Sequence, residues 1–201
     1  MARDVCDGCG RLTSVCICQA LVNVSSPIRV VILQHPSELK QPLATVPLLQ
    51  RCLSPCEVWV GEDFTGSDLQ ADLLADPSSV RLLFPEEGDT AVPPRQDGEI
   101  KILLAIDGTW RKARKILHLN PWLLGLPRMS LQPEQASRYR IRQSSISGSL
   151  ATLEAVSFAL HALTQDAGML ALLQPFEAMI DMQIKKMGPE VFRAHYRVES
   201  E

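Results

Sequence analysis

Continuous apolar runs alternate with helix-like segments along this chain, and that alternation restricts the fold more than any other feature. The runs at 28–34, 56–60, 80–84 and 100–106 are mostly apolar and do not alternate apolar with polar residues. Strands of that kind are buried on both faces, as in parallel sheets covered by helices. The sequence therefore predicts an α/β domain with a mostly parallel sheet and helices on both of its faces.

Helices are expected between these strands and through the C-terminal third. Ser67 suits the N-cap of one helix, and Pro47 and Pro175 suit the first turns of two others. Gly188 and Pro189 are expected to end the helix that contains Pro175. The apolar residues Leu153, Val156, Leu160 and Leu163 fall on one helical face. Helices are expected at 43–53, 68–75 and 111–119, and shorter strands at 127–131 and 138–142.

Four of the six cysteines lie in a short N-terminal segment with the pattern C-x2-C-x6-C-x-C. Close pairs of thiolates can surround one tetrahedral metal ion, and Zn²⁺ accepts four such ligands. Four thiolates leave no open coordination position, so the pattern predicts a structural zinc site. Four reduced thiols in an unstructured N-terminus are the alternative. The expected ligands are Cys6, Cys9, Cys16 and Cys18.

Cys52 and Cys56 form a further pair, which we interpret as buried packing because Cys56 opens an expected strand. The stretch 19–27 is the expected linker. It divides the chain into a zinc-binding segment at residues 1–27 and a larger domain at 28–201. We also expect a cytoplasmic protein without disulfides, since the sequence carries neither a signal-peptide pattern nor an apolar run that could span a membrane.

Charge is distributed unevenly along the chain, although the net charge of −3 excludes a globally basic protein. Residues 57–100 carry eleven acids and two bases, and residues 101–142 carry nine bases and two acids. The basic residues flank one strand-to-helix junction, which favours a surface that contacts RNA. A solvated helix face is the alternative interpretation for 111–115. No phosphate-loop, dinucleotide-binding or G-x-S-x-G pattern occurs in the sequence.

At that junction the expected strand 100–106 runs into Asp107-Gly108-Thr109-Trp110. Ligands of open parallel sheets bind beyond the carboxyl ends of the strands, so Asp107 is expected at a binding site. Gly108 permits a sharp turn, Thr109 can cap the helix, and Trp110 can stack on a flat ligand or close the core. The alternative interpretation is that Asp107 and Thr109 only form an ordinary helix cap.

Residues 104–117, Leu-Ala-Ile-Asp-Gly-Thr-Trp-Arg-Lys-Ala-Arg-Lys-Ile-Leu, resemble the signature of the DTW-domain family of tRNA-uridine aminocarboxypropyltransferases. The resemblance extends over nearly the whole chain. The sequence departs from the family pattern at Leu43-Ala44-Thr45, where Asn-Thr is expected. The other matching segments are the N-terminal cysteines, Leu33-Gln34-His35-Pro36-Ser37-Glu38, Leu82-Leu83-Phe84-Pro85, Tyr139-Arg140-Ile141-Arg142 and Thr152-Leu153-Glu154-Ala155.

The resemblance implies a SPOUT-like fold with a C-terminal knot and S-adenosylmethionine as cosubstrate. It also implies transfer of the 3-amino-3-carboxypropyl group to N3 of a tRNA uridine, with 5′-methylthioadenosine as the leaving nucleoside. The implied partner is tRNA. The sequence points to no protein partner or membrane, and the chain is expected to be a monomer or a homodimer.

Uracil N3 is a poor nucleophile while it carries its proton, so the reaction calls for a general base. Asp107 is the first candidate. Glu38 is the second, although Ser37 and Glu38 also suit the start of a helix. His35 follows the first expected strand, where it either lines the site or only caps a turn.

The same resemblance implies that backbone groups of three loops form the donor pocket. The expected pocket residues are Leu83, Phe84, Pro85, Asp107, Thr109, Trp110, Ser144, Ile146 and Leu150. The expected RNA-binding residues are His35, Arg111, Lys112, Lys115, Arg140 and Arg142. Arg140 and Arg142 can equally bind the carboxylate of the cosubstrate or form ordinary salt bridges.

Three other functions remain open from the sequence. The first is a SPOUT-like methyltransferase, and the second is an aminocarboxypropyltransferase that acts on rRNA. The third is a zinc-bearing RNA-binding module without catalytic activity. The nucleoside released by the reaction distinguishes methyl transfer from aminocarboxypropyl transfer, and a module without turnover releases none.

Overall fold

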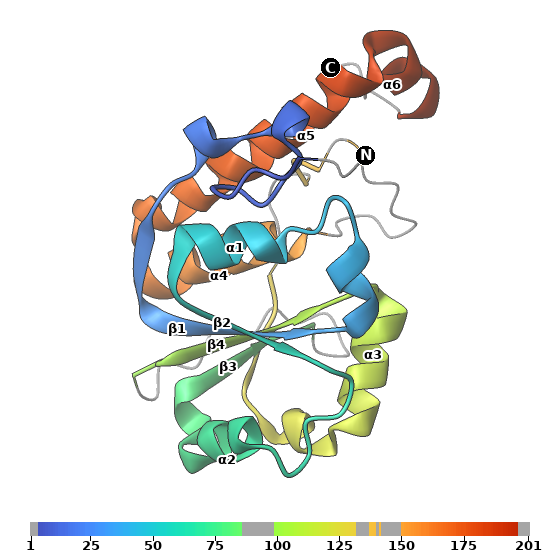
Figure 1. Cartoon of the computed structure of the whole chain (residues 1–201). Helices are drawn as coiled ribbons and strands as arrows, with labels where there is room; N and C mark the ends of the chain where they lie inside the picture. The colour runs from blue at the N-terminus through green and yellow to red at the C-terminus, as the bar shows by residue number, and fades with distance from the viewer. Residues whose placement is uncertain (1–3, 86–98, 132–136, 140, 142–149, 197–201) are drawn as a thin grey trace.

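Figure 1 shows the computed structural model of the chain, which describes residues 4–85, 99–131, 137–139, 141 and 150–196. Within these residues a parallel sheet lies at the centre, with helices on both faces. The strands are β1 (Val24–Gln34), β2 (Leu53–Val60), β3 (Val80–Leu83), β4 (Ile102–Asp107) and β5 (Arg128–Met129). The α-helices are α1 (Val46–Cys52), α2 (Asp68–Ala75), α3 (Trp110–Leu119), α4 (Thr152–Thr164), α5 (Leu173–Met187) and α6 (Pro189–His195). The predicted α/β class is confirmed.

The described strands have the order β2-β1-β4-β3-β5, and each pairs with its neighbours in parallel. β1 and β4 pair continuously from Arg29 opposite Ile102 to Gln34 opposite Asp107. The last residues of these two strands therefore lie side by side at the carboxyl edge of the sheet.

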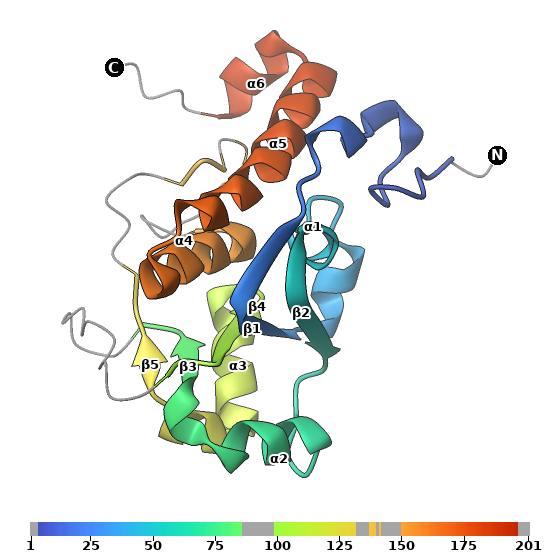
Figure 2. The same ribbon diagram turned by 90° about the vertical axis from the view of Figure 1, so that its left-hand side faces the viewer.

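Both faces of the sheet are buried, which explains why the strands read as continuous apolar runs. In β1, Val30 and Ile32 belong to the core beneath α1 and α4, whereas Val31 and Leu33 belong to the core beneath α2 and α3. None of these four side chains is exposed to solvent. Each such burial stabilises the fold by about 1.5–3 kcal/mol. Figure 2 shows the two helical layers from the side.

Local signals for helix ends are confirmed at several positions. The Ser67 hydroxyl oxygen accepts a hydrogen bond from the backbone N–H of Gln70 and so caps α2. Pro175 lies in the first turn of α5, and Gly188, with φ of +88°, ends that helix. Thr109 occupies the N-cap position of α3, but its side chain makes no capping hydrogen bond, contrary to expectation.

Two predicted strands differ from the structure. The run at 127–131 forms only the two-residue β5, and the described part of 138–142 forms no strand. In the second case the backbone donors are used elsewhere. The N–H of Arg138 donates to Oε1 of Glu154, and the N–H of Tyr139 donates to the Ser137 hydroxyl. Glu154 is fully buried at the start of α4, so this segment is fixed to a helix instead of the sheet.

The N-terminal segment packs on the main domain, mainly against α5 (Figures 1 and 2). Cys9 and Ile17 are buried in the same core as α1, α4 and α5. β1 begins at Val24, inside the stretch expected as a linker, because Val24 is buried and pairs with Leu53 of β2. None of the described helices is long and apolar enough to cross a membrane. The C-terminal knot stays a prediction.

Candidate functional site

The connections that follow β1 and β4, two neighbouring strands, run toward opposite edges of the sheet. The chain leaves β1 through α1 toward β2 at one edge, and it leaves β4 through α3 toward β5 at the other edge. Ligand sites of open α/β sheets lie outside the carboxyl ends of the strands at such a switch point. Here those ends carry Gln34 and Asp107, whose side chains are joined by a hydrogen bond of 2.9 Å from Nε2 to Oδ2.

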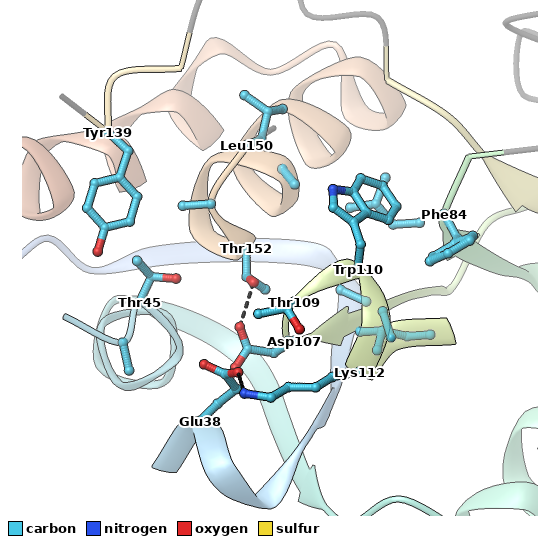
Figure 3. A pocket seen from close by; sticks show the side chains of 18 of the residues that line it. Glu38, Thr45, Phe84, Asp107, Thr109, Trp110, Lys112, Tyr139, Leu150 and Thr152 are labelled. Atoms are coloured by element: carbon cyan, nitrogen blue, oxygen red, sulfur yellow. Dashed lines mark hydrogen bonds and ion pairs between the residues drawn. The ribbon is translucent and has the colours of Figure 1, made fainter. Parts of the chain in front are cut away.

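Asp107 is held from two sides. Its second oxygen, Oδ1, accepts a hydrogen bond of 2.6 Å from the hydroxyl of Thr152 at the start of α4 (Figure 3). The residue is 8% exposed, so it is largely shielded from bulk water but still reaches a cavity wall. Gly108 lies close to the first turn of α3, since an added Cβ there would be 3.1 Å from Cβ of Lys112.

A pocket of about 720 Å³ opens at this edge of the sheet, a volume that suits a small-molecule ligand. Its wall comes from the ends of β3, β4 and β5, the starts of α3 and α4, and the loop before α1. Phe84 and Trp110 form an aromatic part of this wall, edge to face with ring centroids 5.6 Å apart. A flat ligand can pack against such rings.

The polar part of the pocket lies beside Asp107 and contains an ion pair. Nζ of Lys112 and Oε1 of Glu38 are 2.7 Å apart, with side chains 20% and 17% exposed. Figure 3 shows this pair next to the Asp107 carboxylate and on the far side of Thr109 from the aromatic rings. The pocket therefore combines an apolar, aromatic region with a charged region.

Most of the expected donor-pocket residues meet in this cavity. Leu83, Phe84, Pro85, Asp107, Thr109, Trp110 and Leu150 all line it. Ser144 and Ile146 lie outside the described residues. Ala44 and Thr45, at the departure from the family pattern, also line the pocket.

Sequence reasoning missed the side chains that position the site. Gln34 and Thr152 hold Asp107, and the Tyr139 hydroxyl donates to the backbone oxygen of Leu43, which also lines the pocket. All three occur in segments that match the family pattern. Their position in the sequence alone did not indicate what they contact.

His35 is not among the residues that line the pocket. Its Nδ1 accepts a hydrogen bond from the backbone N–H of Ser37, which caps the 3-10 helix η3 (Pro36–Lys40). Its Nε2 lies 2.7 Å from Oε1 of Glu62. The turn-capping role is therefore observed. A hydrogen bond from Lys115, with a smaller contribution from His35, lowers the pKa of Glu62.

The expected RNA-binding residues separate into groups. Arg111 is exposed on α3, and no described residue forms a hydrogen bond or ion pair with its side chain. Lys115 is also exposed but lies 2.5 Å from Oε2 of Glu62. Lys112 belongs to the pocket wall. Arg140 and Arg142 lie outside the described residues.

The four N-terminal cysteines converge on one point. Their Sγ atoms all lie within 4.8 Å of one another, with Cys6 3.4 Å from Cys18, and Cys16 3.6 Å from Cys6 and 3.8 Å from Cys9. Four sulfurs at about 2.3 Å from a tetrahedral Zn²⁺ are about 3.8 Å apart. The cluster could therefore hold one metal ion, and its donor set and spacing fit zinc.

The backbone of the cysteine segment is folded for this convergence. The N–H of Gly10 donates to the oxygen of Cys6 at 2.7 Å, and Gly10 adopts a φ of +70°. A Cβ on Gly8 would lie 2.7 Å from Sγ of Cys18, so only glycine fits there without displacement. The backbone N–H of Cys9, with its neighbouring thiols, lowers the pKa of Cys6 to about 6.

Cys52 and Cys56 do not join this cluster. Cys52 is fully buried in α1, and Cys56 is half-buried in β2. Burial raises the pKa of both thiols, that of Cys56 to about 11. They therefore remain neutral thiols at pH 7, in agreement with a packing role.

Fold and pocket together define a class: a parallel α/β domain whose switch-point pocket holds a carboxylate between an aromatic wall and an ion pair. The chain belongs to the DTW domain family, whose model matches residues 3–184.

Several relatives carry the name tRNA-uridine aminocarboxypropyltransferase. The chain is 32% identical to the mouse protein named tRNA-uridine aminocarboxypropyltransferase 2, over 91% of this chain and 64% of that protein. It is 35% identical to the Drosophila melanogaster protein of the same name, over 80% of this chain and 67% of the relative. An Arabidopsis thaliana protein named tRNA-uridine aminocarboxypropyltransferase A is 23% identical over 93% of this chain. The chain thus spans about two thirds of the mouse and fly relatives, and no solved structure matches it.

Proposed function

We propose that this protein transfers the 3-amino-3-carboxypropyl group of S-adenosylmethionine to N3 of a uridine in tRNA. Family membership and the names of the relatives support the reaction. The observation in the structure that carries the proposal is the placement of the Asp107 carboxylate. This carboxylate is largely buried, is held by Gln34 and Thr152, and faces a cavity of ligand size.

In this proposal Asp107 removes the N3 proton of the bound uracil. The N3–carbon bond forms while the carbon–sulfur bond breaks, and the electron pair of that bond stays on sulfur. The positive charge of the sulfonium is lost, and 5′-methylthioadenosine leaves. The hydrogen bonds from Gln34 and Thr152 fix the orientation of the carboxylate before the uridine arrives, which favours proton transfer.

The cavity fits the proposed cosubstrate in size and in chemical character. Phe84 and Trp110 offer an aromatic surface for the adenine ring, and Asp107 lies between that surface and the Glu38–Lys112 pair. Of the two candidate bases, Glu38 is engaged by Lys112 at 2.7 Å, so Asp107 remains the preferred base.

For tRNA, the proposed contact surface is the exposed side of α3 near the pocket. Arg111 and Lys115 lie there. Arg140 and Arg142, which lie outside the described residues, and His35 remain proposed contacts from the family pattern. Arginine and lysine next to a pocket can hold phosphates and so present one uridine to the base.

The N-terminal cluster is proposed to bind one structural Zn²⁺ through Cys6, Cys9, Cys16 and Cys18. Four thiolates saturate the ion, so no step of the reaction involves it. The ion would hold together a segment that packs on α5 and contributes Cys9 and Ile17 to the core.

The released nucleoside tests the proposed function. Purified protein is incubated with tRNA and S-adenosylmethionine, and the small-molecule products are separated by chromatography. The proposal predicts 5′-methylthioadenosine in amounts that depend on tRNA. S-adenosylhomocysteine would instead identify a methyltransferase. Turnover with rRNA but not with tRNA would identify an rRNA-directed enzyme, and no turnover with either would favour a binding module.

A further inference from the structure

The charged region of the pocket suits the two charges of an amino acid. The Glu38 and Lys112 side chains come from η3 and α3, lie about four-fifths buried, and face the same cavity as Asp107. Oε1 of Glu38 accepts the bond from Lys112, and no other described residue donates to the Glu38 carboxylate. An ammonium group has three donors, so Lys112 also keeps capacity for a second acceptor.

The group to be transferred carries its own ion pair. At neutral pH the 3-amino-3-carboxypropyl chain has an ammonium and a carboxylate on one carbon, two bonds from the carbon that reacts. A zwitterion moved from water into a half-buried pocket needs partners for both charges. A pair of opposite protein charges provides both and leaves no excess charge once the ligand is bound.

We propose that Glu38 and Lys112 bind the amino-acid end of the donor, Glu38 at its ammonium and Lys112 at its carboxylate. The inference rests on the proposed function and deepens it, because it identifies what selects the transferred group. With that end anchored beside Asp107, the reacting carbon lies near the position where N3 loses its proton. A methyl group on the same sulfonium would not be anchored there.

This arrangement predicts how the protein discriminates between two ligands. S-adenosylmethionine contains the amino-acid end, whereas 5′-methylthioadenosine has the same adenosine and sulfur but lacks it. Charge-assisted hydrogen bonds typically contribute enough that losing one lowers affinity about 10- to 100-fold. Glu38→Gln and Lys112→Met are each expected to weaken donor binding by that factor. Binding of 5′-methylthioadenosine should change less than about twofold.

The experiment measures both dissociation constants by calorimetry, without RNA, for the unaltered protein and the two variants. Lys101→Met is the matched control, because it breaks a surface ion pair with Asp76 and lies outside the pocket. It should leave the ratio of the two constants unchanged. The exchanged variant, Glu38→Lys with Lys112→Glu, can reform the ion pair and so keeps the link between η3 and α3. It should still lose the preference for the donor, because the charges are reversed.

Each result decides a different point. If the variants weaken both ligands equally, or if the exchanged pair restores the preference, the ion pair is structural and the inference is wrong. If the variants leave the ratio unchanged while aminocarboxypropyl transfer continues, the inference is wrong and the proposed function stands. If the unaltered protein binds neither ligand, the proposed function fails and the inference fails with it.

Discussion

The Asp107 carboxylate receives hydrogen bonds from two elements that are distant in the sequence, Gln34 of β1 and Thr152 of α4. To act as the general base, the Asp107 carboxylate must accept the N3 proton of uracil, which an amide cannot do. Asp107→Asn keeps the shape and removes that capacity. We expect turnover to fall by about 10²- to 10⁴-fold, the usual contribution of a general base. Affinity for tRNA should stay within about twofold, because phosphate contacts dominate RNA binding.

Single-turnover transfer and a filter-binding titration measure these two quantities on the same preparation. Activity that survives in Asp107→Asn would exclude this residue as the base and turn attention to Glu38. A simultaneous loss of tRNA binding would indicate that the variant has a damaged fold, which a thermal melt would reveal.

Thr152 tests the positioning of the base. Thr152→Val keeps the side-chain volume but removes the donor that lies 2.6 Å from Oδ1 of Asp107. We expect kcat to fall about tenfold, since a misoriented base costs more in the transition state than in binding. Thr152→Ser retains the hydroxyl and should recover most of the rate. Equal rates for the valine and serine variants would contradict a role for this hydrogen bond.

Asp107 could be predicted from the sequence because its signal is local: an apolar strand, an acid, a glycine and a helix in immediate succession. Its partners could not. Gln34 is 73 residues away in the sequence and Thr152 is 45 residues away. Which side chains meet across such distances depends on strand register and helix placement, and neither is encoded in a short motif.

At the level of elements, the N-terminal segment depends on a close approach of Gly8 to Cys18. An alanine Cβ would lie 2.7 Å from Sγ of Cys18, so Gly8→Ala should displace one sulfur from the cluster. We expect this variant to retain less zinc than the unaltered protein, measured as metal content after dialysis against a weak chelator. Gly125→Ala is the control, because nothing lies within 4 Å of its added Cβ. Equal zinc content in both variants, or no zinc in the unaltered protein, would contradict the proposed site.

Elements whose signals are local were predicted well. α2, with its Ser67 cap, spans the predicted residues, and α5 ends at Gly188 as expected. The described part of the strand expected at 138–142 forms no strand, because the donors of Arg138 and Tyr139 bond to Glu154 and Ser137. Glu154, a buried acid on α4, competes for the backbone donors of this segment. The apolar pattern of residues 138–142 cannot reveal that competition.

At the level of the whole molecule, the basic residues that cluster in the sequence do not all face solvent. Lys112 faces the pocket and Lys115 pairs with Glu62, whereas Arg111 is exposed on α3. We expect tRNA affinity to fall steeply with salt, and Arg111→Glu should lower both the affinity and the salt slope, the latter by about one.

Lys185→Glu is the matched control for Arg111, because it makes the same change of charge on α5, which packs on α4 on the other side of the sheet from α3. It should affect tRNA binding much less. Equal effects of the two reversals would indicate a response to net charge alone, and an affinity independent of salt would remove the proposed surface on α3.

The parallel sheet could be predicted from the sequence, but the place where its connections reverse could not. Continuous apolar runs show that strands are buried, yet they do not give the order β2-β1-β4-β3-β5. That order puts the ends of β1 and β4 together and creates the pocket between segments such as 41–45, 83–85 and 150–152. The pocket is therefore a property of topology.

The most direct measurement follows labelled carbon from the donor into tRNA. tRNA is incubated with the protein and S-adenosylmethionine that carries ¹³C either in the aminocarboxypropyl chain or in the methyl group, and its nucleosides are then digested and analysed by mass spectrometry. The proposed function predicts a uridine that contains label from the chain and none from the methyl group, and about 10²- to 10⁴-fold slower labelling with Asp107→Asn. Methyl label in the uridine, or an unmodified uridine with both donors, would contradict it.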